Sequence, residues 1–134
     1  INREWHDGDE LLLTLPMTAE RSVCYHQAVC VKRGPLVFAY APAFDALDDE
    51  NNVTALQARA PFGVALCENA ELETILTENS IELHTKGRVQ QNWSMRAESC
   101  EQPPIAPETD SDVIDVRLVP YAKAQIRLSV FPVV

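Results

Sequence analysis

Lys32-Arg33-Gly34-Pro35-Leu36-Val37-Phe38-Ala39-Tyr40 is the most informative run of residues in this chain. It joins an apolar, β-type segment to a Gly-Pro pair that interrupts ordinary sheet pairing. A second run of the same kind extends from Leu118 to Pro132 near the C-terminus and contains Pro120. The two runs predict β-strands whose limits are set by Gly or Pro.

The Gly34-Pro35 pair is expected to change the direction of the backbone. Gly34 can adopt a positive φ or let another backbone approach closely. Pro35 removes a backbone donor and restricts the conformation of the residue before it. The Gly-Pro pair therefore predicts a β-bulge or a corner between two sheets, after which residues Leu36 to Tyr40 would lie in the core.

Several other short segments show the two-residue alternation of strands. The segment 10–17 would place Leu11, Leu13, Leu15 and Met17 on one face. Further strands are expected within 64–67, 71–77, 81–84, 114–119 and 124–130, and 71–77 also fits a helical face. The acidic residues 43–52 predict a loop. Many short strands separated by Pro-rich and acidic turns predict one all-β domain over residues 1–134, an antiparallel, jelly-roll-like β-sandwich.

Composition limits the classes of partner. The chain has 134 residues, of which 46% are hydrophobic and 23% charged, and this suits one domain with one core. Its formal net charge is -9, with no basic stripe, so nucleic acid is not an expected partner. No apolar stretch approaches the ~20 residues of a transmembrane helix, so no membrane partner is expected either. The start at Ile1, without an initiator Met, predicts a fragment of a longer protein.

The cysteines predict free thiols. Cys24, Cys30, Cys67 and Cys100 are irregularly spaced, and free thiols favour a reducing, cytoplasmic compartment. Cys24, His26 and Cys30 form the single cluster of soft metal ligands. On a straight strand, Cys24 and Cys30 would lie roughly 20 Å apart, too far for one zinc ion. A turn at His26 would bring them nearer, but a fourth ligand is missing, so no metal or cofactor is predicted in this chain.

The acidic residues do not predict catalysis. Glycoside cleavage needs two carboxyl groups that face one another, one of them with a raised pKa. Glu10 and Glu82 fall on polar strand faces, and the other acids lie in polar segments, so no catalytic residue is assigned. Two acidic groups are interpreted as solvated loops rather than calcium sites: Asp45 with residues 48–51, and Asp110, Asp112 and Asp115.

The two tryptophans have different expected roles. Trp93 shares a face with Met95 and Ala97, which predicts a core position. Trp5 lies beside the Asp7-Gly8 turn and is expected to pack on the mouth of the sandwich or on a neighbouring domain. A carbohydrate-binding module would instead expose aromatic side chains as a stacking platform.

Four stretches together resemble the β-sandwich region of the β-L-arabinofuranosidase-like glycoside hydrolases, glycoside hydrolase family 127 and its relatives. Arg33 to Phe38 resembles an Arg-Gly-Pro-Leu-Val-Tyr signature, with Phe38 in place of Tyr. The other three are Trp5 to Asp9 leading into Leu11 to Met17, Pro61 to Leu66, and Leu118 to Tyr121 followed by Ile126-Arg127 and Phe131-Pro132. Pro61 to Leu66 departs clearly from the Trp-Asn-Tyr-Ala-Leu pattern of relatives, and Ala122 stands where Gly is usual.

The resemblance implies a parent enzyme with an (α/α) barrel in front of this domain. In that family the barrel carries a zinc held by cysteine thiolates and a glutamate, and one cysteine is the proposed nucleophile of a retaining mechanism. None of those motifs occurs in this chain, so the expected role is to brace the barrel and to contribute to a homodimer. Trp5 and Arg33 are the expected interdomain contacts. The alternative is a carbohydrate-binding module that contacts glycan directly.

Overall fold

A computed structural model describes residues 2–48, 54–59, 61–93 and 101–134. These residues form strands, two short 3-10 turns and connections, without an α-helix. The strands are β1 (Ala19–Val23), β2 (Val29–Arg33), β3 (Leu36–Tyr40), β4 (Phe44–Asp48), β5 (Thr54–Ala58), β6 (Val64–Leu66), β7 (Glu73–Thr77), β8 (Ser80–Gln90) and β9 (Thr109–Pro120). The 3-10 turns are η1 (Tyr25–Gln27) and η2 (Tyr121–Lys123). No described helix is long and apolar enough to cross a membrane.

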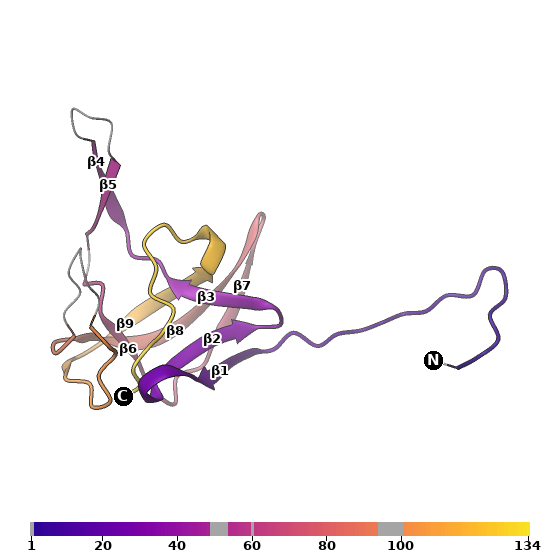
Figure 1. Ribbon diagram of the computed structural model, residues 1–134, viewed down its shortest axis with the longest axis horizontal. Helices are drawn as coiled ribbons and strands as arrows, with labels where there is room; N and C mark the ends of the chain where they lie inside the picture. The colour runs from indigo at the N-terminus through magenta and orange to yellow at the C-terminus, as the bar shows by residue number, and fades with distance from the viewer. Residues whose placement is uncertain (1, 49–53, 60, 94–100) are drawn as a thin grey trace.

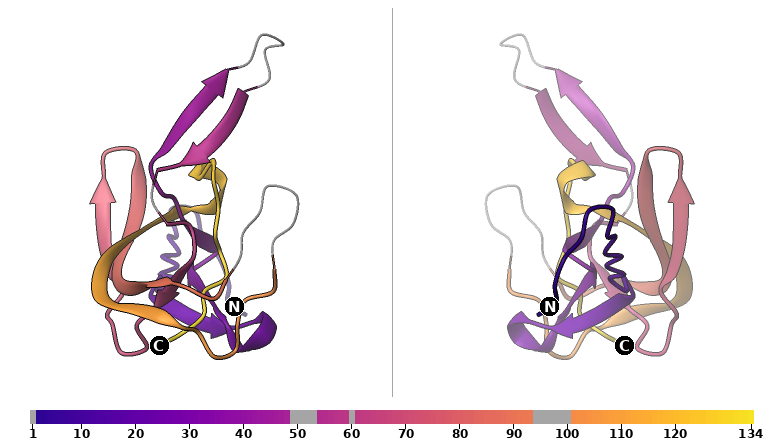
Figure 2. Two further views of the ribbon diagram at one scale, coloured as in Figure 1. Left: turned by 90° about the vertical axis from the view of Figure 1, so that its left-hand side faces the viewer. Right: turned by 90° about the vertical axis from the view of Figure 1, so that its right-hand side faces the viewer.

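Seven strands form one antiparallel sheet in the order β1-β2-β3-β9-β8-β6, with β7 paired to the first part of β8. The sheet curls around its own core, and β4 and β5 form a separate ribbon that projects from it (Figures 1 and 2). The C-terminal segment closes the curl, because Val29 N donates to Phe131 O at 2.7 Å and Leu66 N donates to Pro132 O at 2.9 Å. The expectation of an all-β, antiparallel, sandwich-like domain is confirmed.

Alternation along the two longest strands builds the core. Leu83 and Thr85 on β8 are buried opposite Leu118 and Val116 on β9. Between them lie His84 on β8 and Arg117 on β9, which are polar and more exposed, as expected for a sheet with one solvated face. The core is completed by Val31, Phe38, Val64, Leu66, Trp93 and Phe131. The predicted core position of Trp93 is therefore confirmed, whereas Met95 and Ala97 lie outside the described residues.

The Gly34-Pro35 step is a tight hairpin turn, so the predicted bulge or corner between sheets is wrong. Arg33 pairs with Leu36 across the turn, and Gly34 has φ 56°. A two-residue hairpin turn needs a positive φ at its first position, which glycine supplies without strain. The two predicted strand pieces on either side are confirmed, but Leu36 and Val37 are exposed, so the expected burial holds from Phe38 onward.

Three other local predictions are wrong for reasons of pairing. Residues 10–17 form no strand, because no described strand lies beside them. Part of the predicted loop 43–52 is instead β4, whose pairing with β5 outweighs its acidic composition. The segment 124–130 alternates as a strand would, yet it joins the sheet through isolated bridges such as Tyr40–Leu128.

Candidate functional site

The first described residues form an extended arm, defined here as residues 2–18, that leads away from the sheet (Figure 1). Its apolar side chains lie in solvent: Leu11, Leu13 and Leu15 are 60%, 73% and 64% exposed, and Leu12 is 90% exposed. The alternation seen in the sequence therefore belongs to a segment that is apolar enough for a buried strand but has no partner among the described residues.

Trp5 lies in the outer part of the arm, beside a small turn. Asp9 N donates to His6 O at 3.1 Å, and the Asp9 carboxylate accepts from Arg3 at 2.5 Å. The Arg3 guanidinium lies 4.6 Å from the centre of the Trp5 ring, a cation–π contact. Trp5 remains 48% exposed, so its ring is held by local contacts while one part of it stays accessible.

Arg33 lies at the root of the arm, at the turn between β2 and β3. Its Nη1 lies 4.0 Å from the Met17 sulfur, and the same Met17 side chain packs over Gly34. The Arg33 Nε is shielded from solvent and has no hydrogen-bond acceptor within the described part of the chain. The structure thus places Arg33 and Trp5 at opposite ends of one arm and does not bring them together.

An apolar groove of about 550 Å³ lies at the same end of the sheet as the root of the arm. Leu36 from the start of β3, Leu76 and Ile81 from the β7–β8 hairpin, and Ala122 from η2 line it. Leu76 is exposed, and Lys123 fixes the position of η2 by donating to Asn79 O at 2.5 Å. Sequence reasoning missed this groove, because its residues come from three separate parts of the chain.

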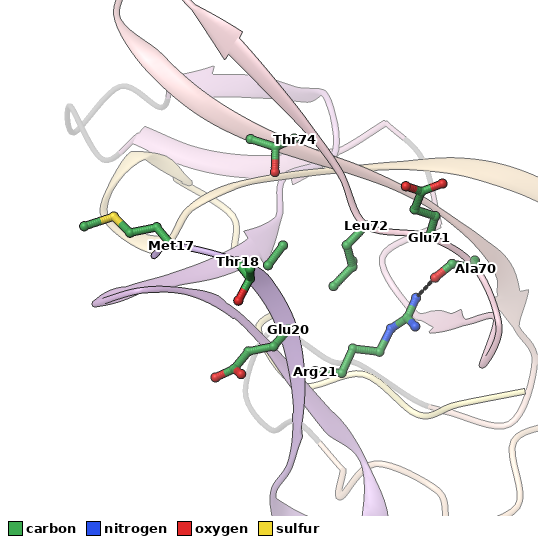
Figure 3. A pocket seen from close by; sticks show the side chains of 9 residues that line it. Met17, Thr18, Glu20, Arg21, Ala70, Glu71, Leu72 and Thr74 are labelled. Carbon is green, nitrogen blue, oxygen red and sulfur yellow. Dashed lines mark hydrogen bonds between the residues drawn. The ribbon is translucent and has the colours of Figure 1, made fainter. Parts of the chain in front are cut away.

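A second cavity, of about 630 Å³, is open to solvent between the edges of β1 and β7 (Figure 3). Arg21 crosses it and donates to Glu68 O at 2.9 Å and to Ala70 O. Glu20 and Glu71 also line the cavity, but their carboxylates point away from one another. This arrangement has no facing carboxyl pair, so it does not support glycoside cleavage.

Glu82, His84 and Arg117 form an electrostatic cluster across β8 and β9. Glu82 on β8 accepts two hydrogen bonds from Arg117 on β9, at 2.6 and 2.5 Å, and its Oε2 lies 3.2 Å from His84 Nε2. The hydrogen bonds from Arg117, and then the contact with His84, lower the pKa of Glu82 to about 2 against the opposing effect of burial. Glu82 therefore stays anionic at neutral pH, which is the opposite of what a general acid needs.

The other candidate metal ligands either bond to neighbouring side chains or lie apart from one another. Within residues 2–48, 54–59, 61–93 and 101–134, no three His, Cys, Asp or Glu side chains are grouped to hold a metal ion. Asp110, Asp112 and Asp115 lie on β9, so the predicted loop is wrong there; Asp110 accepts from Gln91, and Asp115 pairs with Lys86 at 2.5 Å. Residues 49–51 of the other acidic run, and Cys100, lie outside the described residues.

Exposed aromatic rings are separated from one another. Trp5 lies on the arm, Tyr25 in η1 and Tyr121 in η2, and Arg127 stacks on Tyr121 at 4.9 Å. A sugar-binding platform uses neighbouring rings on one surface. The described residues therefore offer no aromatic strip of the kind that a carbohydrate-binding module would use.

Comparison with known proteins gives one fold likeness. The structure of a GH127 β-L-arabinofuranosidase from Geobacillus stearothermophilus T6 matches 89% of this chain with a TM-score of 0.53 and 16% sequence identity. The match covers 19% of that enzyme, so this chain spans about a fifth of its length. No family model matches the sequence, and no curated protein matches it. At this identity the likeness is one of fold.

Proposed function

We propose that this chain is a non-catalytic β-sandwich domain of a larger glycoside hydrolase related to family GH127, and that it braces the catalytic domain. The fold likeness to part of a GH127 enzyme supports this proposal. So does the Arg33-Gly34-Pro35-Leu36-Val37-Phe38 run, which resembles a signature of that family. Glu20 and Glu71 do not face one another, and Arg117 lowers the pKa of Glu82, so neither of these acidic positions is arranged for glycoside cleavage.

The exposed apolar arm is the observation that carries the proposal. Burying one leucine side chain contributes about 1.5–3 kcal/mol, so Leu11, Leu13 and Leu15 together favour a covered state. Soluble domains rarely expose a contiguous apolar patch of this kind unless it is a contact surface. The apolar groove lined by Leu36 and Leu76 is a second exposed apolar surface of the domain. We assign the catalytic domain of the same protein as the partner that covers the arm.

Trp5 and Arg33 have defined roles in this proposal. Trp5 would insert its accessible ring at the outer part of the interface. Arg33 would donate from the exposed Nη end of its guanidinium to a carbonyl or carboxylate of the catalytic domain, because its Nε is shielded from solvent. Replacing either residue with Ala in the full enzyme should weaken docking without changing the fold of the sandwich, and unchanged stability of the full enzyme would count against these roles.

The proposal is tested by comparing the isolated chain with the protein encoded by the complete natural reading frame. In limited proteolysis with thermolysin, we expect cleavage at the leucines of the arm in the isolated chain and at least tenfold slower cleavage in the complete protein. Equal cleavage rates would contradict docking of the arm. A reading frame that encodes this domain alone would overturn the bracing role and make direct glycan binding the function to test.

Matched variants show which face of the arm is buried. If the arm docks as a strand, Leu13→Asp in the complete protein should restore cleavage, because Leu13 shares its face with Leu11 and Leu15. Leu12→Asp is the control, since Leu12 points to the opposite face. A second copy of the chain as the true occupant would appear as a dimer of the isolated domain in light scattering.

A further inference from the structure

The connection between β1 and β2 brings two thiols into contact. Cys24 follows β1 and Cys30 lies within β2, and η1 reverses the chain between them. Their sulfur atoms lie 2.9 Å apart, with the Cys30 thiol donating to Cys24. The separation of roughly 20 Å expected on a straight strand does not apply. The alternative considered from the sequence, a turn at His26, is present as η1.

The turn holds this contact through several constraints. Cys24 N donates to Ala28 O at 2.8 Å, and the Cys24 thiol points to the same oxygen at 3.3 Å. His26 and Gln27 have φ 53° and 61°, a left-handed conformation that is strained for non-glycine residues. Such a conformation persists where the surrounding structure fixes it. The two sulfurs are therefore positioned by the turn and by the β1–β2 pairing.

The third candidate ligand does not join them. The His26 ring stacks on Tyr25 with 4.4 Å between ring centres. No metal-binding group of three ligands exists within the described part of the chain. Two thiols in contact without a metal-binding third partner favour redox chemistry over metal binding. Cys24 and Cys30 are both partly accessible to a small oxidant.

We propose that Cys24 and Cys30 form a redox-active dithiol that closes to an intramolecular disulfide by exchange with a small-molecule disulfide such as oxidised glutathione. The Cys24 thiolate attacks one sulfur of the oxidant, and one glutathione leaves as a thiol. Cys30 then attacks the Cys24 sulfur of this mixed disulfide, and the second glutathione leaves. Two protein thiols lose two protons and two electrons, and the oxidant takes up both.

The surroundings of the two sulfurs set the order of attack. Burial, together with the hydrogen bond to Cys24, raises the pKa of Cys30 to about 11. Cys30 therefore stays protonated at neutral pH, and its S–H donates toward Cys24, which makes Cys24 the first nucleophile. Burial still raises the pKa of Cys30 in the mixed disulfide, but the hydrogen bond to the Cys24 thiol is gone, and the 2.9 Å contact places Cys30 to act as the resolving thiol.

The proposal is tested on the 134-residue chain with excess oxidised glutathione at pH 8, followed by alkylation and mass spectrometry. We expect the wild type to lose about 2 Da by forming one disulfide, mapped to Cys24 and Cys30 in a peptide digest. Cys67→Ser is the matched control and should form the same disulfide. Cys30→Ser should instead stop at a stable glutathione adduct on Cys24. Four free thiols, or a disulfide that involves Cys67 or Cys100, would overturn the proposal.

A second readout tests the effect on the fold. Closing a short loop restricts the unfolded chain, so the oxidised protein should melt roughly 5 °C higher than the reduced protein. Cys24→Ser should melt at the same temperature under both conditions. An equal or lower melting temperature for the oxidised wild type would show that the bond does not lock the native turn.

Discussion

At the scale of single residues, Glu82 shows how a sheet surface can keep a carboxylate charged well below the usual pKa of a glutamate. Its side chain is 13% exposed, and Arg117, on the neighbouring strand, contacts both of its oxygens. The two-oxygen geometry makes this pair stronger than an ordinary surface ion pair. His84, directly opposite Arg117 in the β8–β9 register, adds a contact to the same carboxylate.

The lowered pKa of Glu82 predicts a specific dependence of stability on pH. Because the folded value is about 2 and the usual value is 4.5, the unfolded state binds more protons between them. The pair therefore stabilises the protein above pH 4.5, and this contribution disappears as the pH falls toward 2. Glu82→Gln should lower the free energy of unfolding by about 1 kcal/mol at pH 7, with a shrinking difference below pH 4.5.

Urea denaturation at a series of pH values measures this difference. Glu78→Gln, at an exposed position in the β7–β8 turn, is the control and should change stability little at any pH. A Glu82→Gln difference that stays constant from pH 7 to pH 3 would show that the carboxylate charge is not responsible.

At the scale of elements, Gly87 allows β8 to pass close to its neighbours. A Cβ atom at this position would lie 2.6 Å from Ala65 O on β6 and 2.8 Å from a methyl group of Val116 on β9. Because one of these atoms belongs to the backbone, rotation of a side chain cannot relieve the clash. We expect Gly87→Ala to destabilise the domain by about 1–3 kcal/mol.

Gly63→Ala is the matched comparison for Gly87→Ala. The nearest atom to a Cβ at Gly63 is Cβ of Gln90 at 3.3 Å, so its cost should be smaller. The midpoint of urea unfolding measures both changes, with an unchanged slope if the transition remains two-state. A smaller loss for Gly87→Ala than for Gly63→Ala would contradict the close packing of β6, β8 and β9.

Sequence patterns predicted the elements well where a strand has one buried and one solvated face. The β9 region was recognised from Ile114, Val116 and Leu118, which alternate with polar residues. The same alternation in residues 10–17 was misleading, because it shows that a segment can be buried but not which partner will bury it. β4 was missed because its stability comes from pairing with β5 rather than from its own composition.

The candidate site could be predicted only in part for the same physical reason. Trp5 and Arg33 were identified from local motifs, and both lie on one exposed arm or at its root. The groove formed by Leu36, Leu76 and Ala122 required the three-dimensional arrangement of distant hairpins. The Cys24–Cys30 contact depends on the left-handed turn at His26 and Gln27. The sequence does not predict this conformation, because neither residue is a glycine.

At the scale of the whole molecule, the C-terminal segment connects two distant strands of the curled sheet, β2 and β6. Phe131 exchanges two backbone hydrogen bonds with Val29 on β2, at 2.7 and 2.9 Å. Leu66 on β6 donates to Pro132 O and accepts from Val134 N, so residues 131–134 connect β6 to β2. The Phe131 side chain is fully buried between these contacts and belongs to the main core.

This closure predicts that Phe131 is among the most sensitive positions of the fold. Phe131→Ala removes a buried ring and leaves a cavity, which costs about 3–5 kcal/mol. Small domains have a total stability of about 5–15 kcal/mol, so the urea concentration at the unfolding midpoint should fall by a large fraction. Fluorescence of buried Trp93, in a Trp5→Phe background, reports the transition. Phe62→Ala is the control, because Phe62 packs on the same core but is only partly buried. Equal losses for the two variants would show that the C-terminal segment lies on a sheet that is already closed, whereas a larger loss for Phe131→Ala supports its closing role.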